Sequence, residues 1–416
     1  MYICIDIKLQ PFMRKQLVLI FLMACPFMAV HATHYPVATV HSVKCIEHND
    51  TSIYVLMPEG IEVINKVTGR KTVYKKETGY FVDQWNAIEQ SGTNLNSVGQ
   101  NALAVAHNTI WVGGNDGVLT RIHDGIADTT RHYLDLSLLG DGEDLWPIGI
   151  ESLVIDQNGT AVIGGTNCIS AIYPSGEKQT LIFPKDHYGT QVWKMVIDSK
   201  EDIWISCMDS GFGNGLMKYH VGGELQVVSD RDNPDLPYKS GYVKGMTIDN
   251  DGYLWFASSH NDDNGWRAKL LKYDGSNYAS YDVGASNNVP ASVECDGQSR
   301  IWFLPTLGDK TKYEQYSKGP LCCFDHGVIT RYEWNQEAGY CYCVDVDGDS
   351  VYIGTDNGVL VFSDGSFHWL NDTEAGVSES TVNKSMPSQT YDLQGRRLNT
   401  EPKHGVYIQN GKKVMR

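Results

Sequence analysis

Three observations predict an all-β fold for this chain of 416 residues. A phrase recurs along it: an apolar strand, a turn of the Asp-Gly type, and a second apolar strand centred on Trp or Tyr. Its clearest copies are Met195–Ser206 and Met246–Ala257. Around these turns apolar and polar residues alternate with a period of two, and β-branched and aromatic residues are frequent. No long stretch shows the 3.6-residue period of a helix.

Seven copies of this repeat align on the marker position of the second strand, roughly 50 residues apart, and the third is a weak copy with valine in place of the aromatic residue. The marker positions are Tyr54, Trp111, Val162, Trp204, Trp255, Trp302 and Tyr352. In the fifth unit four strands are predicted, at Val243–Asp249, Tyr253–Ser258, Lys269–Tyr273 and Asn277–Asp282.

Each unit contains two predicted turns. The first, such as Asp249–Gly252, follows the first strand, and the second follows the third strand. Asn, Asp and Gly tolerate the positive φ that tight hairpin turns require. The second turns are Asp124-Gly125, Ser175-Gly176, Asp274-Gly275, His326-Gly327 and Asp364-Gly365.

Four strands in about 50 residues is the size of a propeller blade. A blade has two apolar faces, and packing blades in a ring buries both of them. We therefore predict a seven-bladed β-propeller of four-stranded antiparallel blades over residues 35–370, with the marker aromatics between neighbouring blades. Two separate β-sandwiches are the alternative, which a single period along the whole region argues against.

The ends differ in composition from the repeats. Arg14 and Lys15 precede an apolar stretch, Leu17–Val30, which predicts a signal peptide over residues 1–32, with Met13 as an alternative start. Lipid anchoring at Cys25 is a less favoured alternative. The mature chain is then expected in the periplasm, on the outer surface or secreted, without a membrane span. Residues 371–390 predict a linker, and 391–416 a small appendage with two strand-like segments.

The formal net charge of −16 disfavours nucleic acid as a partner, because phosphates attract Lys and Arg. Eight cysteines lie outside the signal segment. Cys341 and Cys343, two apart on a predicted inner strand, are expected to share a face and not to pair with each other. Most of the cysteines are expected to be small buried hydrophobic residues, with one or two disulfides as the alternative.

The repeat resembles the two-component regulator propeller family, with best matches at Trp111–Val118 and Tyr352–Val359 and a further match at Ile248–Ala257. In that family the propellers are periplasmic sensor regions of hybrid histidine kinases that detect glycans. The sequence shows no kinase or regulator segment, so the resemblance implies the propeller and not the signalling role.

The tail resembles the C-terminal sorting domain of type IX secretion cargo, on Tyr391–Arg397, Pro402–Ile408 and the pair Lys412-Lys413. The match covers about thirty residues, whereas members of that family have a longer sandwich. Together the two resemblances imply an exported or surface protein of the Bacteroidota type.

Motifs for catalysis are scarce. The sequence has no nucleophile elbow, zinc-protease motif, phosphate loop or dinucleotide fingerprint. Asp345, Asp347 and Asp349 resemble the start of a calcium loop, but the later ligand positions of an EF-hand are missing and a hairpin turn is the favoured interpretation. No metal or other cofactor is otherwise indicated.

Loop length gives the more informative signal. The connection between second and third strands is short in the seventh unit, at Thr355–Gly358, and long in three consecutive units: 208–215, Ser259–Arg267 and Pro305–Pro320. These connections share one face of a propeller with the segments between blades, and loops on a rigid scaffold are where binding residues concentrate. The predicted ligand-binding residues are Trp85, Trp146, Tyr188, Phe212, Tyr242, His260, Trp266, Arg267, Tyr313, Tyr316 and Tyr340.

Two functions remain open. The leading hypothesis is an exported, non-enzymatic ligand-binding or scaffold propeller whose ligand is a glycan or a surface protein. The alternative is a polysaccharide lyase or hydrolase with its site at the central channel mouth, for which His187, Tyr188, His260 and Arg267 are candidates. A structural surface protein without a small ligand is a third possibility.

Overall fold

The computed structural model contains strands and turns and no helix in the residues it describes. Those residues are 42–58, 60–75, 81–82, 93–94, 98–114, 117–131, 133–135, 145–183, 190–208, 215–228, 243–262, 265–285, 290, 292–305, 319–334, 337–370, 380–381, 390–391, 397–398, 406–409 and 412–415. The predicted signal peptide lies outside them. No helix in this part of the chain is long and apolar enough to cross a bilayer.

The strands form sets of four, each set consecutive in sequence and antiparallel throughout. The first half of the chain supplies β1 (Cys45–His48), β2 (Ser52–Met57), β3 (Gly60–Asn65) and β4 (Lys71–Lys75); β7 (Val98–Ala106), β8 (Thr109–Gly114), β9 (Val118–His123) and β10 (Ile126–Arg131); and β13 (Ser152–Ile155), β14 (Ala161–Gly164), β15 (Cys168–Ile172) and β16 (Lys178–Ile182). The second half supplies β17 (Gln191–Ile197), β18 (Asp202–Met208), β19 (Leu216–His220) and β20 (Leu225–Val228); β21 (Val243–Ile248), β22 (Leu254–Asp262), β23 (Gly265–Tyr273) and β24 (Tyr278–Ala285); β25 (Val293–Cys295), β26 (Ile301–Phe303), β27 (Leu321–Asp325) and β28 (Val328–Tyr332); and β29 (Cys341–Asp347), β30 (Ser350–Thr355), β31 (Gly358–Ser363) and β32 (Ser366–Trp369).

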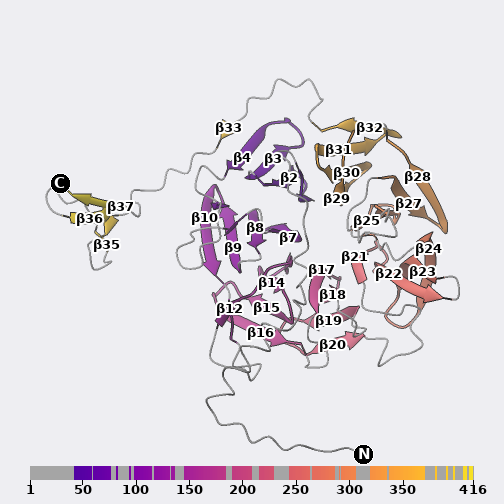
Figure 1. Ribbon diagram of the computed structural model, residues 1–416, viewed down its shortest axis with the longest axis horizontal. Coiled ribbons are helices and arrows are strands. Elements are labelled where there is room, and N and C mark those ends of the chain that lie inside the picture. The colour runs from indigo at the N-terminus through magenta and orange to yellow at the C-terminus, as the bar shows by residue number, and fades with distance from the viewer. Residues whose placement is uncertain are drawn as a thin grey trace, which may run out of the picture. The chain divides into compact units, whose positions relative to one another are not determined.

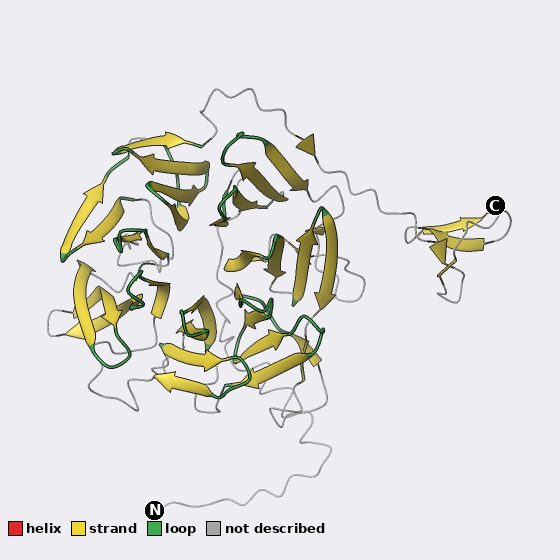
Figure 2. Ribbon diagram, turned by 180° about the vertical axis from the view of Figure 1, so that it is seen from behind, coloured by secondary structure: helices red, strands yellow, loops and turns green. Residues whose placement is uncertain are grey.

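The sets are arranged around a central channel (Figures 1 and 2). The first strand of each set is innermost, and these strands contact one another in the closed order β1, β7, β13, β17, β21, β25, β29 and back to β1. This arrangement is a β-propeller with four-stranded antiparallel blades, which confirms the predicted architecture. The sets beginning with β7 and β13 are joined into one eight-stranded sheet, because β7 and β13 run parallel and pair at Asn101 and Ser152.

The fifth unit tests the strand predictions in detail. The first strand and the two turns lie where they were predicted, and Gly252 in the first turn has a φ of +84°. The predicted loop Ser259–Arg267 is wrong in part, because β22 continues to Asp262 and β23 begins at Gly265. Ladder pairs from Ser259 with Ala268 to Asp262 with Gly265 satisfy the backbone groups of this segment, so it is an extended hairpin rather than a loop.

An aspartate at the end of the first strand organises the repeat in three sets. In the fifth unit Asp249 Oδ1 accepts the backbone N–H groups of Asp251 (3.1 Å) and Tyr253 (2.8 Å), and Oδ2 accepts the indole N–H of Trp255 at 2.8 Å. Asp198 and Asp296 do the same for Trp204 (3.0 Å) and Trp302 (2.9 Å). One carboxylate therefore closes the turn and fixes the aromatic side chain of the second strand.

Units without this aspartate close the turn differently, as the first and second units show. In the first unit Asn49 closes the turn, and its amide donates to the hydroxyl of Tyr54 at 3.0 Å. In the second unit the turn shortens to His107-Asn108, both at positive φ, and the buried indole nitrogen of Trp111 has no hydrogen-bond partner in the described part of the chain.

The marker side chains lie between one blade and the next, as predicted. Trp255 packs against Val293, Ile301 and Phe303 of the following set, and Trp302 packs against Val344 of the set after that. Each is at most 3% exposed. Burying an aromatic side chain of this size contributes roughly 1.5–3 kcal/mol, so the ring is stabilised by the same contact repeated at each interface.

Contacts between the first and last sets close the ring. Val43 packs with Tyr352 and Val359, and the backbone N–H of Val43 donates to the carbonyl of Thr355 at 2.9 Å. On the side of the ring that carries the turns between first and second strands, which we call the turn side, His48 Nδ1 and Asp345 Oδ2 are 2.8 Å apart. Both sets consist of strands consecutive in sequence, so closure depends on side-chain packing and a few polar contacts rather than on a sheet shared by the two ends.

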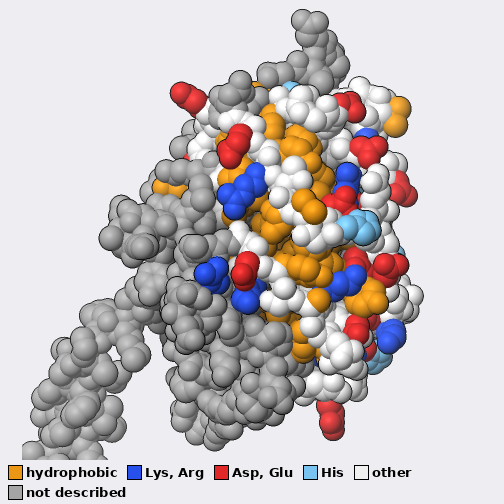
Figure 3. Space-filling view, turned by 90° about the vertical axis from the view of Figure 1, so that its right-hand side faces the viewer, with side chains coloured by type: hydrophobic (Ala, Val, Ile, Leu, Met, Phe, Trp, Pro, Cys, Tyr) orange, Lys and Arg blue, Asp and Glu red, His pale blue; other side chains and the backbone are white. Residues whose placement is uncertain are grey.

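The fourth strands lie at the rim and are only partly covered. The last strand of the sixth set, β28, has mainly exposed and half-buried residues. Tyr332 on this strand packs against Phe362 of the next set, with ring centroids 4.6 Å apart. Figure 3 shows this side of the ring, where hydrophobic side chains are grouped between acidic and basic ones.

Four short strands follow the ring near the C-terminus. β34 (Thr390–Tyr391), β35 (Arg397–Leu398), β36 (Val406–Gln409) and β37 (Lys412–Met415) form a sheet of order β35-β34-β36-β37. The two predicted strand-like segments therefore divide into four strands. Within the predicted linker, β33 (Ser380–Thr381) pairs in parallel with β4. Two further pairs complete the inventory: β5 (Phe81–Val82) with β6 (Thr93–Asn94), and β11 (Tyr133–Asp135) with β12 (Leu145–Pro147).

All eight cysteines outside the signal segment are free thiols, and all but Cys295 are buried. The prediction that Cys341 and Cys343 share a face is wrong. A bulge in β29 lies between them, and Cys341 packs toward the sixth set while Cys343 packs toward the first. An extra residue in a strand shifts the alternation of its side chains, which separates the two thiols.

The aspartate of the turn predicts a difference between two Asp→Asn variants. Asp198→Asn should destabilise the protein by about 1–2 kcal/mol, because an amide cannot accept the two backbone N–H groups and the indole N–H together. Asp156→Asn is the matched control, since Asp156 accepts only the N–H groups of Asn158 and Thr160 and faces no indole. Urea unfolding monitored by tryptophan fluorescence measures both. Equal losses would contradict the role given to the indole bond.

The His48–Asp345 contact predicts a pH dependence of stability. The hydrogen bond that His48 donates to Asp345 raises the pKa of His48, although burial acts against it. A raised pKa means that the stabilisation is fully present below the unfolded pKa of about 6.5 and is lost as pH rises through the folded value.

His48→Gln should therefore reduce the unfolding free energy by about 1 kcal/mol at about pH 5, and by less at about pH 9. His123→Gln is the control, because His123 is exposed beside Asp124 and such pairs contribute little. A His48→Gln loss that stayed constant from acid to alkaline pH would contradict the ionic character of the contact.

Candidate functional site

The structure describes part of the predicted loop face. Within the sequence-predicted set, six ligand-binding residues and the catalytic candidate His187 lie outside the described residues. The six are Trp85, Tyr188, Phe212, Tyr242, Tyr313 and Tyr316. Trp146 lies in β12 opposite Leu134.

Tyr340 immediately precedes β29, and its backbone is tied to Asp356. Its N–H donates to Asp356 Oδ2 at 2.9 Å, and its carbonyl accepts the N–H of Asp356 at the same distance. These bonds hold the segment that enters the innermost strand of the last set against the connection after β30.

His260, Trp266 and Arg267 come together on the extended β22–β23 hairpin. His260 pairs with Arg267, and Asn261 pairs with Trp266 one step nearer the tip. Arg267 also pairs with Ala285 of β24, and its Nη1 lies 3.8 Å from Asp282 Oδ2. The structure therefore unites three predicted residues on one projecting hairpin.

A second group of polar side chains lies in the central channel and was not predicted. It occupies the register position opposite each marker aromatic on the innermost strands. The residues at this position are Glu47, Ala104, Val154, Val196, Thr247, Glu294 and Asp345. Three consecutive units thus carry small or apolar residues there, and the other units carry three carboxylates and a threonine.

A cavity of about 330 Å³ follows these innermost strands. Glu47, Glu294 and Asp345 line it together with Lys194. The remaining wall includes Ala104, Val154 and Val196 from the units that lack a carboxylate. The channel is therefore acidic on one side and apolar on the other.

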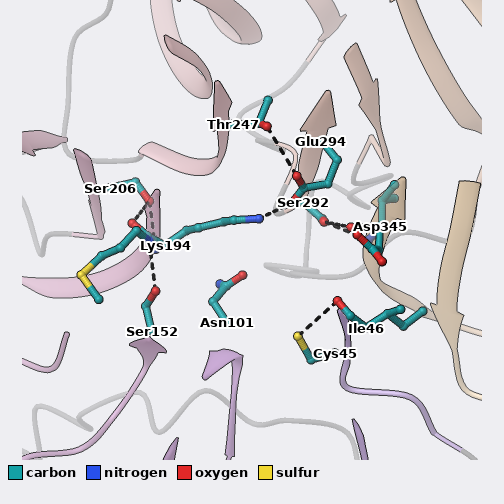
Figure 4. A network of polar contacts seen from close by, with 12 residues as sticks. Cys45, Ile46, Asn101, Ser152, Lys194, Ser206, Thr247, Ser292, Glu294 and Asp345 are labelled. Atoms are coloured by element: carbon teal, nitrogen blue, oxygen red, sulfur yellow. Dashed lines mark hydrogen bonds and ion pairs between the residues drawn. The ribbon is translucent and has the colours of Figure 1, made fainter. Parts of the chain in front are cut away.

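Lys194 has room in the channel because its equivalents are small. Two residues before the position opposite the marker, the other units carry Cys45, Ala102, Ser152, Gly245, Ser292 and Cys343. Figure 4 shows the Lys194 side chain extended across the channel to Glu294, which it meets as an ion pair. Thr247 Oγ1 donates to the other oxygen of Glu294 at 3.4 Å.

The electrostatics of the channel are dominated by burial. Burial lowers the pKa of Lys194, but the charge of Glu294 and the hydrogen bond to it outweigh this, and the net pKa is raised. Burial raises the pKa of Glu294 more than Lys194 lowers it. The pKa of Glu47 is also well above its usual range, through burial first and the charge of Asp345 second. The carboxylates are thus only partly compensated by the lysine.

Two of the three aspartates that resemble the start of a calcium loop contact cationic side chains of the protein instead. Asp345 pairs with His48, and Asp347 meets Lys66 and lies 3.9 Å from His48 Nε2. Among the described residues, no group of three or more His, Cys, Asp or Glu side chains is arranged to hold a metal ion.

Serine hydroxyls fix the innermost strands to one another around the cavity. Ser152 Oγ accepts the N–H of Met195 at 3.0 Å, and Ser292 Oγ accepts the N–H of Val344 at 2.9 Å. Ser206 Oγ donates to the carbonyl of Lys244 at 2.8 Å. These bonds cross from one set to the next, so the channel lining is rigid.

A second layer of polar side chains lies on the innermost strands, one residue before the position of Lys194 and therefore nearer the loop face. Burial lowers the pKa of Lys244 to about 8, and its ammonium lies 5.2 Å from the ring centroid of Trp193. Asn101 Nδ2 donates to the carbonyl of Trp193 at 2.8 Å. Burial likewise lowers the pKa of Lys44 to about 8 and raises that of Glu151 to about 7.

The sequence held only a partial signal for the channel residues. Glu47 and Asp345 lie seven residues before their markers and Glu294 lies eight before its own, so alignment on the marker aromatics does not superpose the three carboxylates. They share one position only in the register of the first strand against the second, in which Lys194 is the one large residue two positions earlier.

Comparison with known proteins supports the fold. No known protein family matches the sequence, and no curated protein matches it. Virginiamycin B lyase from Staphylococcus aureus is similar in structure, with a TM-score of 0.56 and 14% identity over 78% of this chain and 94% of that one. The WD40 β-propeller domain of Doa1 gives a TM-score of 0.51 and 12% identity over 79% of this chain and 95% of that one.

The extracellular domain of BT4673 from B. thetaiotaomicron, a two component system protein, gives a TM-score of 0.41 and 15% identity over 88% of this chain and 50% of that one. The first two likenesses, which have TM-scores above 0.5, show a β-propeller fold and no more. Membership of the two-component regulator propeller family and the sorting role of the tail stay predictions.

Proposed function

We propose that this chain is an exported, non-enzymatic binding or scaffold propeller. Its ligand, a glycan or a surface protein, would lie against the face that carries the connections between the second and third strands of the fourth to sixth units. The observation that carries the proposal is the β22–β23 hairpin, which extends four ladder pairs beyond Ser258 and bears His260, Trp266 and Arg267.

The hairpin is suited to binding because it is braced. β24 follows β23 as far as Ala285, so a third strand supports the base of the projection. Asp282 on β24 lies 3.4 Å from Lys269 Nζ and 3.8 Å from Arg267 Nη1. Residues on paired strands hold their positions better than residues on loops, and Trp and Arg are frequent anchors of interfaces.

We also propose that the ring has seven blades, with the eight-stranded sheet counted as two. Each half of that sheet has its own four antiparallel strands, and the parallel contact that joins the halves is one residue pair. The closed order of the innermost strands supports this count.

Trp266→Ala should weaken binding of a ligand at this face by at least about tenfold, the effect of removing an interface anchor. The measurement starts with a glycan array and with capture of surface proteins of the source cell, and continues with titration of the ligand found. Val328→Ala is the control, because Val328 is exposed on the outermost strand of another set. Unaltered affinity of the Trp266 variant for that ligand would refute the assignment of this face.

The second candidate function is a carbohydrate-active lyase or hydrolase at the channel. One observation favours it: Glu47, Glu294 and Lys194 converge on one cavity, and carboxyl groups with raised pKa are suited to proton transfer near neutral pH. Of the residues named for this role from the sequence, His260 and Arg267 are not in the cluster, since they lie on the hairpin, while His187 and Tyr188 lie outside the described residues.

A panel of neutral and acidic polysaccharides tests this candidate, with reducing-end release for hydrolysis and ultraviolet absorbance of unsaturated products for elimination. Glu47→Gln should lower turnover by at least about a hundredfold, the usual contribution of an acid–base group. Glu177→Gln, on an exposed outer turn, is the control. Absence of activity on the whole panel, or full activity of Glu47→Gln, would remove the candidate.

A further inference from the structure

The charge in the channel is unbalanced. Three carboxylates line the cavity, and two of them have a cationic partner: Glu294 has Lys194, and Asp345 has His48. The Glu47 side chain lines the same cavity and makes no hydrogen bond or ion pair with the described residues. A carboxyl group in this setting is costly unless it is protonated or meets a cation.

The opposite wall has a different chemistry. Ala104, Val154 and Val196 occupy the positions equivalent to the carboxylates. Val105, Ala106, Ile155 and Ile197 continue this wall toward the turn side of the ring. An apolar surface beside a carboxyl group without a cationic partner is complementary to a molecule with an apolar body and a positively charged group.

The volume limits the size of such a molecule. About 330 Å³ is near the lower end of the range for small-molecule pockets, roughly 300–1,000 Å³. The walls are fixed by the serine bonds between innermost strands, so the cavity is formed in advance and binding does not have to order it.

We propose that the turn-side half of the central channel binds a small organic cation, with its ammonium group against Glu47 and its apolar body against Ala104, Val154 and Val196. This site is separate from the loop face and from the β22–β23 hairpin, and it requires no catalysis. Asp345 and Glu294 add negative potential around the ammonium group, and the charge of Asp345 already raises the pKa of Glu47.

Lys194 acts as an internal competitor in this arrangement. The ammonium group of Lys194 forms an ion pair with Glu294 and is close enough to Glu47 to act on the pKa of Glu47. A ligand ammonium must therefore share the acidic wall with a lysine of the protein. Removing the lysine charge leaves two of the three carboxylates open to the ligand.

The test uses the full chain and two probes of the same shape, benzylamine as its ammonium salt and benzyl alcohol. Titration is followed by ligand-observed NMR at neutral pH and low salt. Benzylamine should bind at least about tenfold more tightly than benzyl alcohol, since a hydrogen bond between charged groups is stronger than one to a neutral hydroxyl. Equal binding of the two probes, or binding of neither, would overturn the proposal.

Two variants locate the site. Glu47→Gln should weaken benzylamine binding by about tenfold and leave benzyl alcohol unchanged, while the exposed control Glu177→Gln changes neither. Glu47 makes no hydrogen bond that the substitution would break, so the variant should fold, which its thermal unfolding checks. Lys194→Met should tighten benzylamine binding by several-fold. Wild-type affinity in Glu47→Gln, or weaker binding in Lys194→Met, would contradict the placement of the ammonium group.

Discussion

The packing of one aromatic side chain between successive blades is the interaction on which the rest of the structure depends. Trp204, Trp255 and Trp302 are each fixed twice, by an aspartate of their own hairpin turn and by apolar side chains of the next set. The first contact fixes the register of the first strand against the second. The second sets the distance from one blade to the next, so together they place the innermost strands around the channel.

This arrangement leaves the channel positions free to vary. A residue opposite the marker aromatic lies on the innermost strand, and in every unit except the fifth it lines the channel cavity. Alanine, valine, threonine, aspartate and glutamate all occupy it in one chain. Because the frame repeats from unit to unit while the inward positions vary, each unit can contribute a different group to one cavity. A repeat protein can build an asymmetric site in this way.

The fold could be predicted from the sequence because its signals are local. The turn Asp249–Gly252 and the alternation on both sides of it specify a hairpin, and its repetition specifies the ring. The long connection Ser259–Arg267 predicts a loop, whereas backbone pairing extends β22 and β23 through most of this segment. The different faces of Cys341 and Cys343 could not be predicted, because a bulge leaves no mark in the residue pattern.

The channel cluster could not be predicted for a different reason. Glu47 and Glu294 are far apart in sequence, and the structure brings them together only through closure of the ring. These residues form no sequence motif, because each repeat contributes a single side chain and the side chains come together only in the folded ring. Six of the eleven predicted ligand-binding residues, such as Trp85 and Tyr313, lie outside the described residues, so for them the prediction stands as it was made.

Stability alone does not account for the acidic wall. The equivalent positions in the second to fourth units show that alanine or valine fits the frame, and replacing buried charges by apolar residues of similar volume is often neutral or stabilising. Yet the first, sixth and seventh units place carboxylates there, and the fourth sends Lys194 across the channel to meet one of them. His48 couples this wall to ring closure through Asp345. A ligand that neutralised Glu47 would relieve repulsion at the seam between the first and last sets, so occupancy of the channel and stability of the closed ring are linked.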